Sequence, residues 1–112
     1  MVEEVTPDEV KNKLEEAQIV DIRQPPQYAS GHIPNAINIP LSELPRRIGE
    51  HEWGDDIVVV CPIGQSSIQA ARLIESFEDV DEDASVTSMA GGYDAWEYEL
   101  ETHQDDTEEV EI

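Results

Sequence analysis

Hydrophobic residues in this chain form short runs of two kinds, and the two kinds alternate. Uninterrupted apolar runs bounded by turn residues predict buried strands over residues 18–22, 36–39, 57–60 and 84–89. Apolar residues at helical spacing predict helices over residues 7–16, 41–48, 66–77 and 93–100, with a single helical turn over 26–29. Because strands alternate with helices, the pattern predicts an α/β fold with a mainly parallel sheet.

Cap and turn residues support these elements and limit the folded domain. Thr6, Pro7 and Glu9 form the signature of a helix start, and Gly91-Gly92 predicts a tight turn. A chain of 112 residues suits one domain, which we expect to cover residues 6–100. In residues 101–112, six of the twelve residues are acidic, which predicts a disordered tail.

The charge balance excludes several kinds of partner. The chain has 6 Lys and Arg against 27 Asp and Glu, a net charge of −21. Binding to nucleic acid needs a basic footprint, and docking on an anionic membrane needs one too, so we expect neither partner. We expect the protein in the cytoplasm, because the sequence has no apolar run of membrane-spanning length and Met1-Val2-Glu3-Glu4 does not resemble a signal peptide.

The acidity itself has three interpretations. A carboxylate-rich surface suits molar salt, where the self-repulsion of the protein is screened within about 3 Å. The alternatives are a charge-mimicking or cation-binding protein, and an ordinary protein of high solubility. Only Lys11 and Lys13 are lysines, which favours a salt-adapted source, and the chain has no D-x-D-x-D-G calcium loop.

Cys61 is the single cysteine, which excludes an internal disulfide and every multi-cysteine zinc site. His32, His51 and His103 lack metal-ligand spacing, so we predict no metal and no cofactor. A lone cysteine is usually a small buried hydrophobe. The position of Cys61 argues otherwise, because it follows the predicted strand 57–60 at the edge of a parallel sheet where ligands bind.

The loop after Cys61 has the composition of an anion cradle. It leads into the helix that begins at Ser66-Ser67, and N–H groups at such a junction lower a cysteine pKa from its usual value of about 8.5. Gly64 permits a tight curve, and the two serine hydroxyls can cap the helix or donate to a ligand. Residues 57–74 contain no acidic residue, which suits both a packed core and a thiolate site. We therefore predict a reactive nucleophile at Cys61.

Three segments, in order, resemble the rhodanese family of sulfurtransferases, specifically its single-domain type. They are residues 20–40 (VDIRQPPQYASGHIPNAINIP), 61–67 (CPIGQSS) and 89–96 (MAGGYDAW). The resemblance implies a five-stranded, mainly parallel sheet with helices on both faces. It also implies transfer of a sulfane sulfur, from thiosulfate or a related donor, through a persulfide on Cys61.

The resemblance further implies which residues bind the donor and what accepts the sulfur. The backbone amides and hydroxyls of residues 63–67 would hold the transferring sulfur; these residues are Ile63, Gly64, Gln65, Ser66 and Ser67. Many family members have Arg where this chain has Ser66, so we expect weak thiosulfate affinity. Because no second cysteine can resolve the persulfide, the acceptor must be an external thiol, such as a thioredoxin-like protein.

Other polar residues of the matching segments have structural interpretations. We expect Asp21 and Arg23 to form an ion pair that braces a loop, and His32 to donate a bracing hydrogen bond. Tyr93 and Trp96 are predicted core residues beneath the last helix.

Three other functions compete with sulfur transfer. Phosphatases and arsenate reductases of a related fold need C-x5-R, but the residue six positions after Cys61 is Ser67. A non-catalytic rhodanese-like interaction or sensing module stays open, as does a dedicated persulfide carrier for a thiolation partner.

The interpretation of a salt-adapted surface makes a direct prediction about stability. Because screening relieves repulsion among the carboxylates, the melting temperature should rise when KCl is raised from about 0.1 M to about 2 M. Thermal unfolding followed by circular dichroism measures it. An unchanged melting temperature across that range would contradict salt adaptation.

Overall fold

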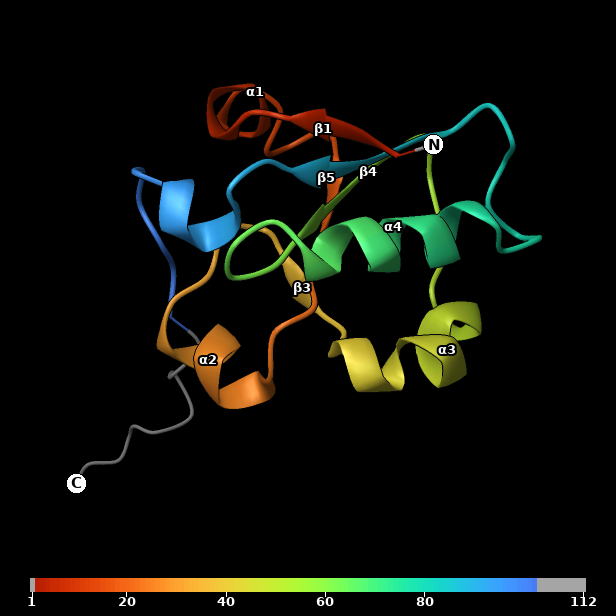
Figure 1. The fold of residues 1–112 in the computed structure, drawn as a ribbon, viewed down its shortest axis with the longest axis horizontal. Coiled ribbons are helices and arrows are strands. Elements are labelled where there is room, and N and C mark those ends of the chain that lie inside the picture. The colour runs from red at the N-terminus through yellow and green to blue at the C-terminus, as the bar shows by residue number, and fades with distance from the viewer. Residues whose placement is uncertain (1, 103–112) are drawn as a thin grey trace.

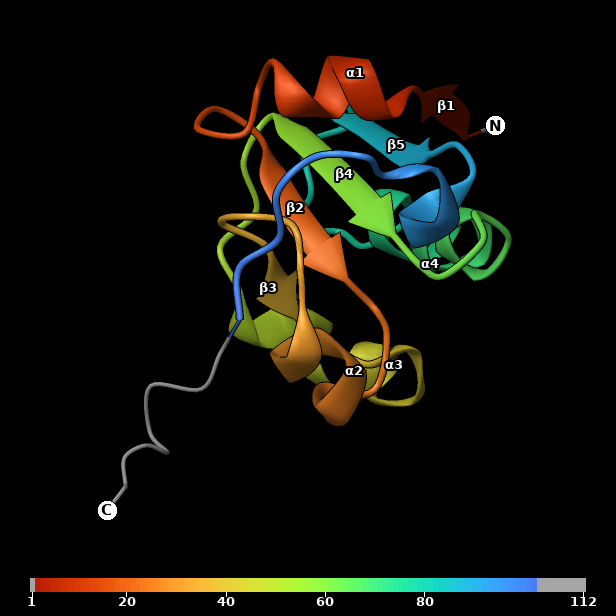
Figure 2. The same ribbon diagram turned by 90° about the vertical axis from the view of Figure 1, so that its left-hand side faces the viewer.

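A five-stranded parallel sheet forms the centre of the structure, a computed structural model that describes residues 2–102. The strands lie in the order β1-β5-β4-β2-β3, and every pair is parallel. Figure 1 shows helix α4 lying across the sheet, and Figure 2 shows β2, β4 and β5 running in the same direction in front of it. The strands are β1 (Glu3–Val5), β2 (Gln18–Asp21), β3 (Ile37–Asn38), β4 (Asp56–Val60) and β5 (Ser85–Met89).

Helical segments connect these strands. The α-helices are α1 (Pro7–Lys11), α2 (Pro25–Ser30), α3 (Leu44–Arg47) and α4 (Ser66–Glu75), and the 3-10 turns are η1 (Leu41–Glu43), η2 (Ile48–Glu50) and η3 (Gly92–Ala95). Thr6 caps α1 through the predicted capping box, in which the Thr6 hydroxyl accepts the Glu9 N–H at 3.1 Å.

The central strand β4 is buried on both faces, and its side chains divide the core into two layers. Ile57 and Val59 join the cluster that contains Ala70 and Ile74 of α4. Val58 and Val60 point to the opposite face, in the cluster that contains Val10 of α1 together with Trp96. The predicted α/β fold, with helices on both faces of a parallel sheet, is therefore confirmed.

Two elements differ from the prediction, each for a physical reason. The edge strand β1 was not predicted from the hydrophobic pattern, because two of its three residues are exposed glutamates and its partner β5 is distant in sequence. The helix predicted over residues 93–100 is wrong: η3 ends at Ala95 and the chain continues in extended form at Trp96. The Trp96 side chain is buried in the core, and its indole N–H donates to the Glu99 carbonyl, which suits this extended path. The N–H groups of Tyr93 and Asp94, at the start of η3, donate to the carbonyls of Cys61 and Pro62.

The other predicted helices form, with shifted boundaries. The first ends at Lys11 rather than at residue 16, and α4 ends at Glu75, two residues early. The segment 41–48 divides into η1, α3 and the start of η2, with Pro45 near the N-terminus of α3, where a missing N–H costs nothing.

The end of the described chain packs against the domain. Glu101 and His32 exchange two backbone hydrogen bonds of 2.8 Å, so the first residue of the predicted tail pairs with the loop after α2. The rest of that tail, from residue 103, lies outside the described residues. Within residues 2–102, no helix combines the length and apolar character needed to cross a membrane.

Candidate active site

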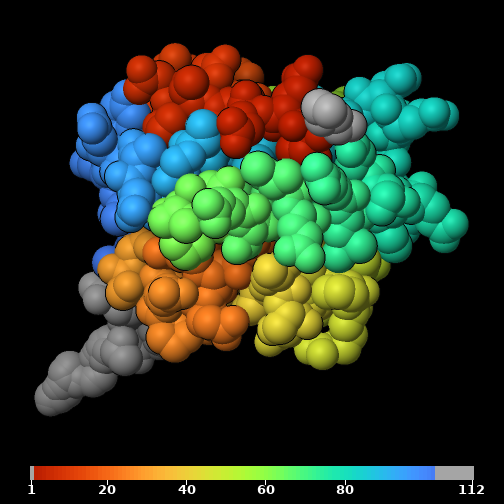
Figure 3. Space-filling model, in the orientation of Figure 1, coloured from red at the N-terminus to blue at the C-terminus, as the bar shows by residue number. Residues whose placement is uncertain are grey.

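Cys61 lies directly after β4, at the carboxyl end of the sheet's middle strand. Its side chain is fully buried, in the same core layer as α4. The loop that follows runs over the edge of the sheet and enters α4 at Ser66. In Figure 3, the residues that follow β4 lie on the molecular surface, between the segment near residue 90 and the segment near residue 25. The sulfur is thus a buried atom beneath an exposed loop.

Hydrogen bonds converge on the Cys61 sulfur. The Gly64 N–H donates to Sγ at 3.0 Å, and the Cys61 thiol donates to Ser67 Oγ at 3.2 Å. Burial has the largest single effect on the pKa of Cys61 and raises it, but the Ser67 hydroxyl and the N–H groups of Ser67, Gly64 and Ile63 together lower this pKa below its ordinary value. The site therefore favours a thiolate by hydrogen bonding.

The predicted loop residues take different positions around this sulfur. Gly64 donates its N–H to Sγ and adopts a φ of +87°, which other residues adopt only with strain. Ser67 is buried beside the thiol, whereas Ile63 contributes its backbone N–H and leaves its side chain 52% exposed. Gln65 and Ser66 are exposed at the start of α4, where Gln65 is the N-cap without a capping hydrogen bond from its side chain.

The Gly91-Gly92 turn forms the wall of the loop. Its sequence predicted a tight turn, and both residues have positive φ, +76° and +60°. A Cβ atom at Gly92 would overlap the carbonyl oxygen of Cys61 and lie 2.7 Å from the backbone nitrogens of Ile63 and Gly64. Just beyond, the Tyr93 N–H donates to the Cys61 carbonyl at 2.9 Å. This close approach fixes the loop, a role that the sequence did not reveal.

A second residue that the sequence analysis missed is Ser88 on β5. Its Oγ lies 2.6 Å from Ser67 Oγ, and both side chains are fully buried. The available signal was weak, because Ser88 is one of two buried hydroxyl residues in β5, the other being Thr87.

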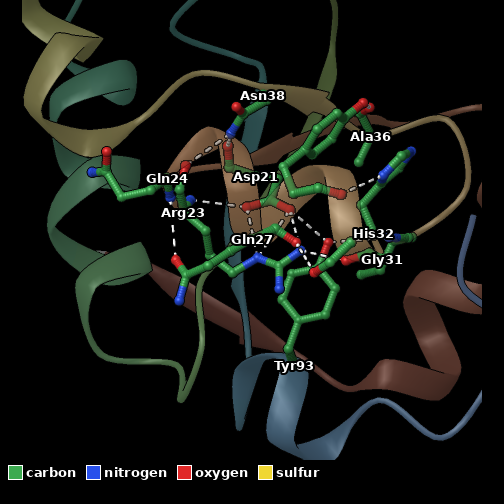
Figure 4. Close-up of polar contacts among 12 residues, drawn as sticks. Asp21, Arg23, Gln24, Gln27, Gly31, His32, Ala36, Asn38 and Tyr93 are labelled. Atoms are coloured by element: carbon green, nitrogen blue, oxygen red, sulfur yellow. Dashed lines mark hydrogen bonds and ion pairs between the residues drawn. The ribbon is translucent and has the colours of Figure 1, made fainter. Parts of the chain in front are cut away.

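A polar network beside the site is centred on the buried carboxylate of Asp21, at the end of β2 (Figure 4). The Arg23 guanidinium donates to both carboxylate oxygens at 2.9–3.2 Å, and the Arg23 N–H donates to Oδ1 at 2.9 Å. The Tyr93 hydroxyl donates to Oδ2 at 2.8 Å, and the Arg23 guanidinium lies 3.6 Å from the Tyr93 ring centroid. The predicted bracing ion pair is confirmed.

The same network holds the loop after α2. Arg23 donates to the Gly31 carbonyl at 2.6 Å, and the Ile33 N–H donates to the Tyr93 hydroxyl at 3.0 Å. Burial and the Asp21 charge raise the pKa of Tyr93 well above its ordinary value, so this hydroxyl stays a donor at neutral pH.

The remaining predicted residues have structural positions too. Nδ1 of His32 lies 2.8 Å from the Tyr28 carbonyl, and the His32 ring stacks on the Tyr28 ring with centroids 3.9 Å apart, which confirms its bracing role. Trp96 is buried in the core as predicted, and Tyr93 packs at its margin. Among the described residues, no group of three or more His, Cys, Asp or Glu side chains could hold a metal ion.

Comparison with known proteins identifies this arrangement. A family model for the rhodanese-like domain matches residues 6–99. The chain is 38% identical over 85 residues to the thiosulfate sulfurtransferase GlpE of Pseudoalteromonas translucida (strain TAC 125), covering 74% of this chain and 75% of that protein.

Solved structures of similar fold support the same family. The chain is similar to a rhodanese-like domain protein from Staphylococcus aureus, with a TM-score of 0.73 and 32% identity over 90% of this chain and 98% of the other. It is also similar to the human single-domain sulfurtransferase TSTD1, with a TM-score of 0.68 and 26% identity over 86% of this chain and 96% of that one.

The parallel sheet and the cysteine loop at its carboxyl edge therefore define a domain of the sulfurtransferase class. The chain belongs to the rhodanese-like domain family, as its three motifs indicated.

The buried ion pair generates a prediction about stability. Arg23→Met should lower the free energy of unfolding by about 3–5 kcal/mol, because it leaves the Asp21 carboxylate buried without its cation. Arg46→Met is the matched control: Arg46 is 73% exposed and pairs with Glu43 at 3.8 Å, so its loss should cost about 0–1 kcal/mol. Urea unfolding measures the stability of both variants. Equal losses would contradict the role of Arg23 as the cation that stabilises the buried Asp21 carboxylate.

The close approach of the glycine turn generates a second prediction. Left-handed backbone strain alone should make Gly92→Ala cost about 1–2 kcal/mol of stability. We expect a larger loss, because the new Cβ also displaces the Cys61 loop. The substitution should also slow alkylation of Cys61 at neutral pH, since the Gly64 N–H would move away from the sulfur. Gly49→Ala, whose Cβ would meet only Phe77 at 3.6 Å, is the control. Matching behaviour of the two variants would show that the turn does not fix the loop.

Proposed function

We propose that the protein transfers a sulfane sulfur through a persulfide on Cys61. One observation carries the proposal: a buried cysteine sulfur at the end of the central strand receives a Gly64 N–H and contacts the Ser67 hydroxyl, and its pKa is lowered. Packing alone does not require donors directed at a sulfur. The similarity to a thiosulfate sulfurtransferase supports the same chemistry.

The proposed reaction has two displacements. The Cys61 thiolate attacks the outer sulfur of thiosulfate or a related donor, the S–S bond of the donor breaks, and sulfite leaves with the electron pair. An acceptor thiolate then attacks the outer sulfur of the enzyme persulfide and restores the Cys61 thiolate. Neither step needs a general base, because both nucleophiles react as thiolates.

Residues 63–67 form the proposed donor site. The N–H groups of Ile63, Gly64 and Ser67 are near enough to lower the pKa of Cys61, so they can also stabilise the charge of a bound persulfide. Gln65 and Ser66 are exposed at the entrance. Ser66 is the residue that would meet the oxyanion of thiosulfate, and its neutral hydroxyl supports a weaker hold than a guanidinium gives.

An external thiol is the proposed acceptor, and the surface around the loop supports it. The chain has no second cysteine, and the exposed residues next to Cys61 are uncharged in a protein of net charge −21. The half-exposed Ile63 side chain gives an apolar contact for a protein acceptor such as one of the thioredoxin-like class. Such a contact does not depend on attraction between charges.

Intact mass spectrometry tests the proposal. After incubation with thiosulfate, we expect the wild-type protein to gain the mass of one sulfur atom, and a thiol such as dithiothreitol should remove it. Cys61→Ser, of nearly the same size, is the control and should gain nothing while keeping its circular dichroism spectrum.

The other outcomes separate the alternatives. An adduct formed from glutathione persulfide but not from thiosulfate would indicate a dedicated persulfide carrier. No adduct from either donor, in a folded protein whose Cys61 still reacts with iodoacetamide, would overturn sulfur transfer and favour a binding module.

A further inference from the structure

A chain of three buried side chains leads from the nucleophile to the neighbouring strand. Cys61, Ser67 and Ser88 are each fully buried. Sγ and Ser67 Oγ are 3.2 Å apart, and the two serine oxygens are 2.6 Å apart, a short hydroxyl contact in which either atom can donate. The three residues come from the end of β4, the first turn of α4 and β5, so three separate elements build this chain.

We propose that Ser88 is a positioning residue, whose hydroxyl forms with Ser67 a pair that reverses its hydrogen-bond direction when Cys61 ionises. The inference rests on the proposed function, because it assigns Ser88 a role toward the proposed nucleophile. Ser88 acts through Ser67 and does not touch the sulfur.

This pair offers Cys61 a hydrogen bond in both of its protonation states. In the thiol state, Cys61 donates to Ser67 Oγ, and the Ser67 hydroxyl donates to Ser88 Oγ. In the thiolate state, the Ser67 hydroxyl turns to donate to the sulfur, and the Ser88 hydroxyl donates to Ser67 Oγ. One proton leaves Cys61 for solvent, the two hydroxyl hydrogens only rotate, and no bond between heavy atoms changes.

The thiolate state needs Ser88 more than the thiol state does. A donor to Ser67 Oγ polarises the Ser67 hydroxyl and strengthens its bond to the anion, and in a buried site this cooperative effect is larger than in water. Without Ser88, Ser67 could still donate to the thiolate, but its own oxygen would lose the polarising donor. Ser88 thus favours ionisation.

The fold holds this geometry through the register of the sheet. Ser88 is paired with Val59 across the β4–β5 ladder, two residues before Cys61, which fixes its distance from the nucleophile. On β2, the Asp21 carboxylate faces its own cation, Arg23. The other titratable groups on the packed elements are Asp56 on β4, Arg72 and Glu75 on α4, Tyr93 and Asp94 on η3, and Glu3 and Glu4 on β1.

The pH dependence of Cys61 alkylation by iodoacetamide tests the proposal. Ser88→Ala should lower the ionisation constant of Cys61 about threefold to tenfold, moving the midpoint up by roughly half to one pH unit. Ser88→Thr, which keeps the hydroxyl, should retain the wild-type midpoint. Thr87→Val is the matched control, because it removes a buried hydroxyl of the same strand that bonds to the Ile57 carbonyl instead.

A midpoint unchanged in Ser88→Ala, or moved equally in Thr87→Val, would overturn the proposal. A measurement on the wild-type protein covers the case in which Ser88→Ala does not fold. The Ser88 ¹³Cβ signal should titrate with the same midpoint as Cys61, and a signal that ignores this ionisation would also overturn the proposal. Neither measurement needs a sulfur donor. If both gave the expected result but no persulfide formed, only the proposed function would be overturned.

Discussion

The buried carboxylate of Asp21 is the constraint on which the rest of the structure depends. An unpaired charge in that position would be prohibitively costly, so the fold must bring donors to it. Arg23 supplies a guanidinium and an N–H, and Tyr93 supplies a hydroxyl. Each partner then holds something else: Arg23 binds the Gly31 carbonyl, and the Tyr93 backbone binds the Cys61 carbonyl. One charge at the end of β2 thereby ties together segments that are distant in sequence, including the loop of the proposed nucleophile.

The turn after β5 shows why glycine is needed at position 92, where it crosses the Cys61 loop. The Cys61 loop curls around its sulfur, and the turn after β5 approaches it so closely that no side chain fits at Gly92. Packed in this way, the loop cannot open without breaking bonds from Tyr93 and Asp94 to its carbonyls. Donors to the sulfur are therefore positioned before any substrate arrives, which reduces the reorganisation that charge formation would otherwise require.

The sequence predicted what depends on local pattern and missed what depends on distant partners. The β4 run and the Cys61 loop were recognisable because apolar residues, a strand end and a helix start lie next to one another in the chain. Strand β1 has no such signal, since its pairing with β5 forms across most of the sequence. The helix predicted after Gly92 fails because the backbone becomes extended at Trp96, whose side chain is buried in the core and whose indole N–H donates to the Glu99 carbonyl; periodicity cannot reveal these contacts. Ser88 looks like an ordinary strand residue until the fold places it beside Ser67.

A net charge of −21 disfavours a further negative charge on Cys61, and the site lowers the pKa of this cysteine without a cation. The groups that lower the pKa of Cys61 are N–H and O–H dipoles, and the nearby Arg23 is committed to Asp21. Ions in solution screen exposed charges but have little access to dipoles buried beside a sulfur. A cysteine whose pKa is lowered by buried dipoles therefore does not lose that activation as salt rises, whereas one activated by a surface lysine or arginine would. The acidic surface and the neutral site can then respond to salt separately: the surface gains from screening, and the thiolate does not lose by it.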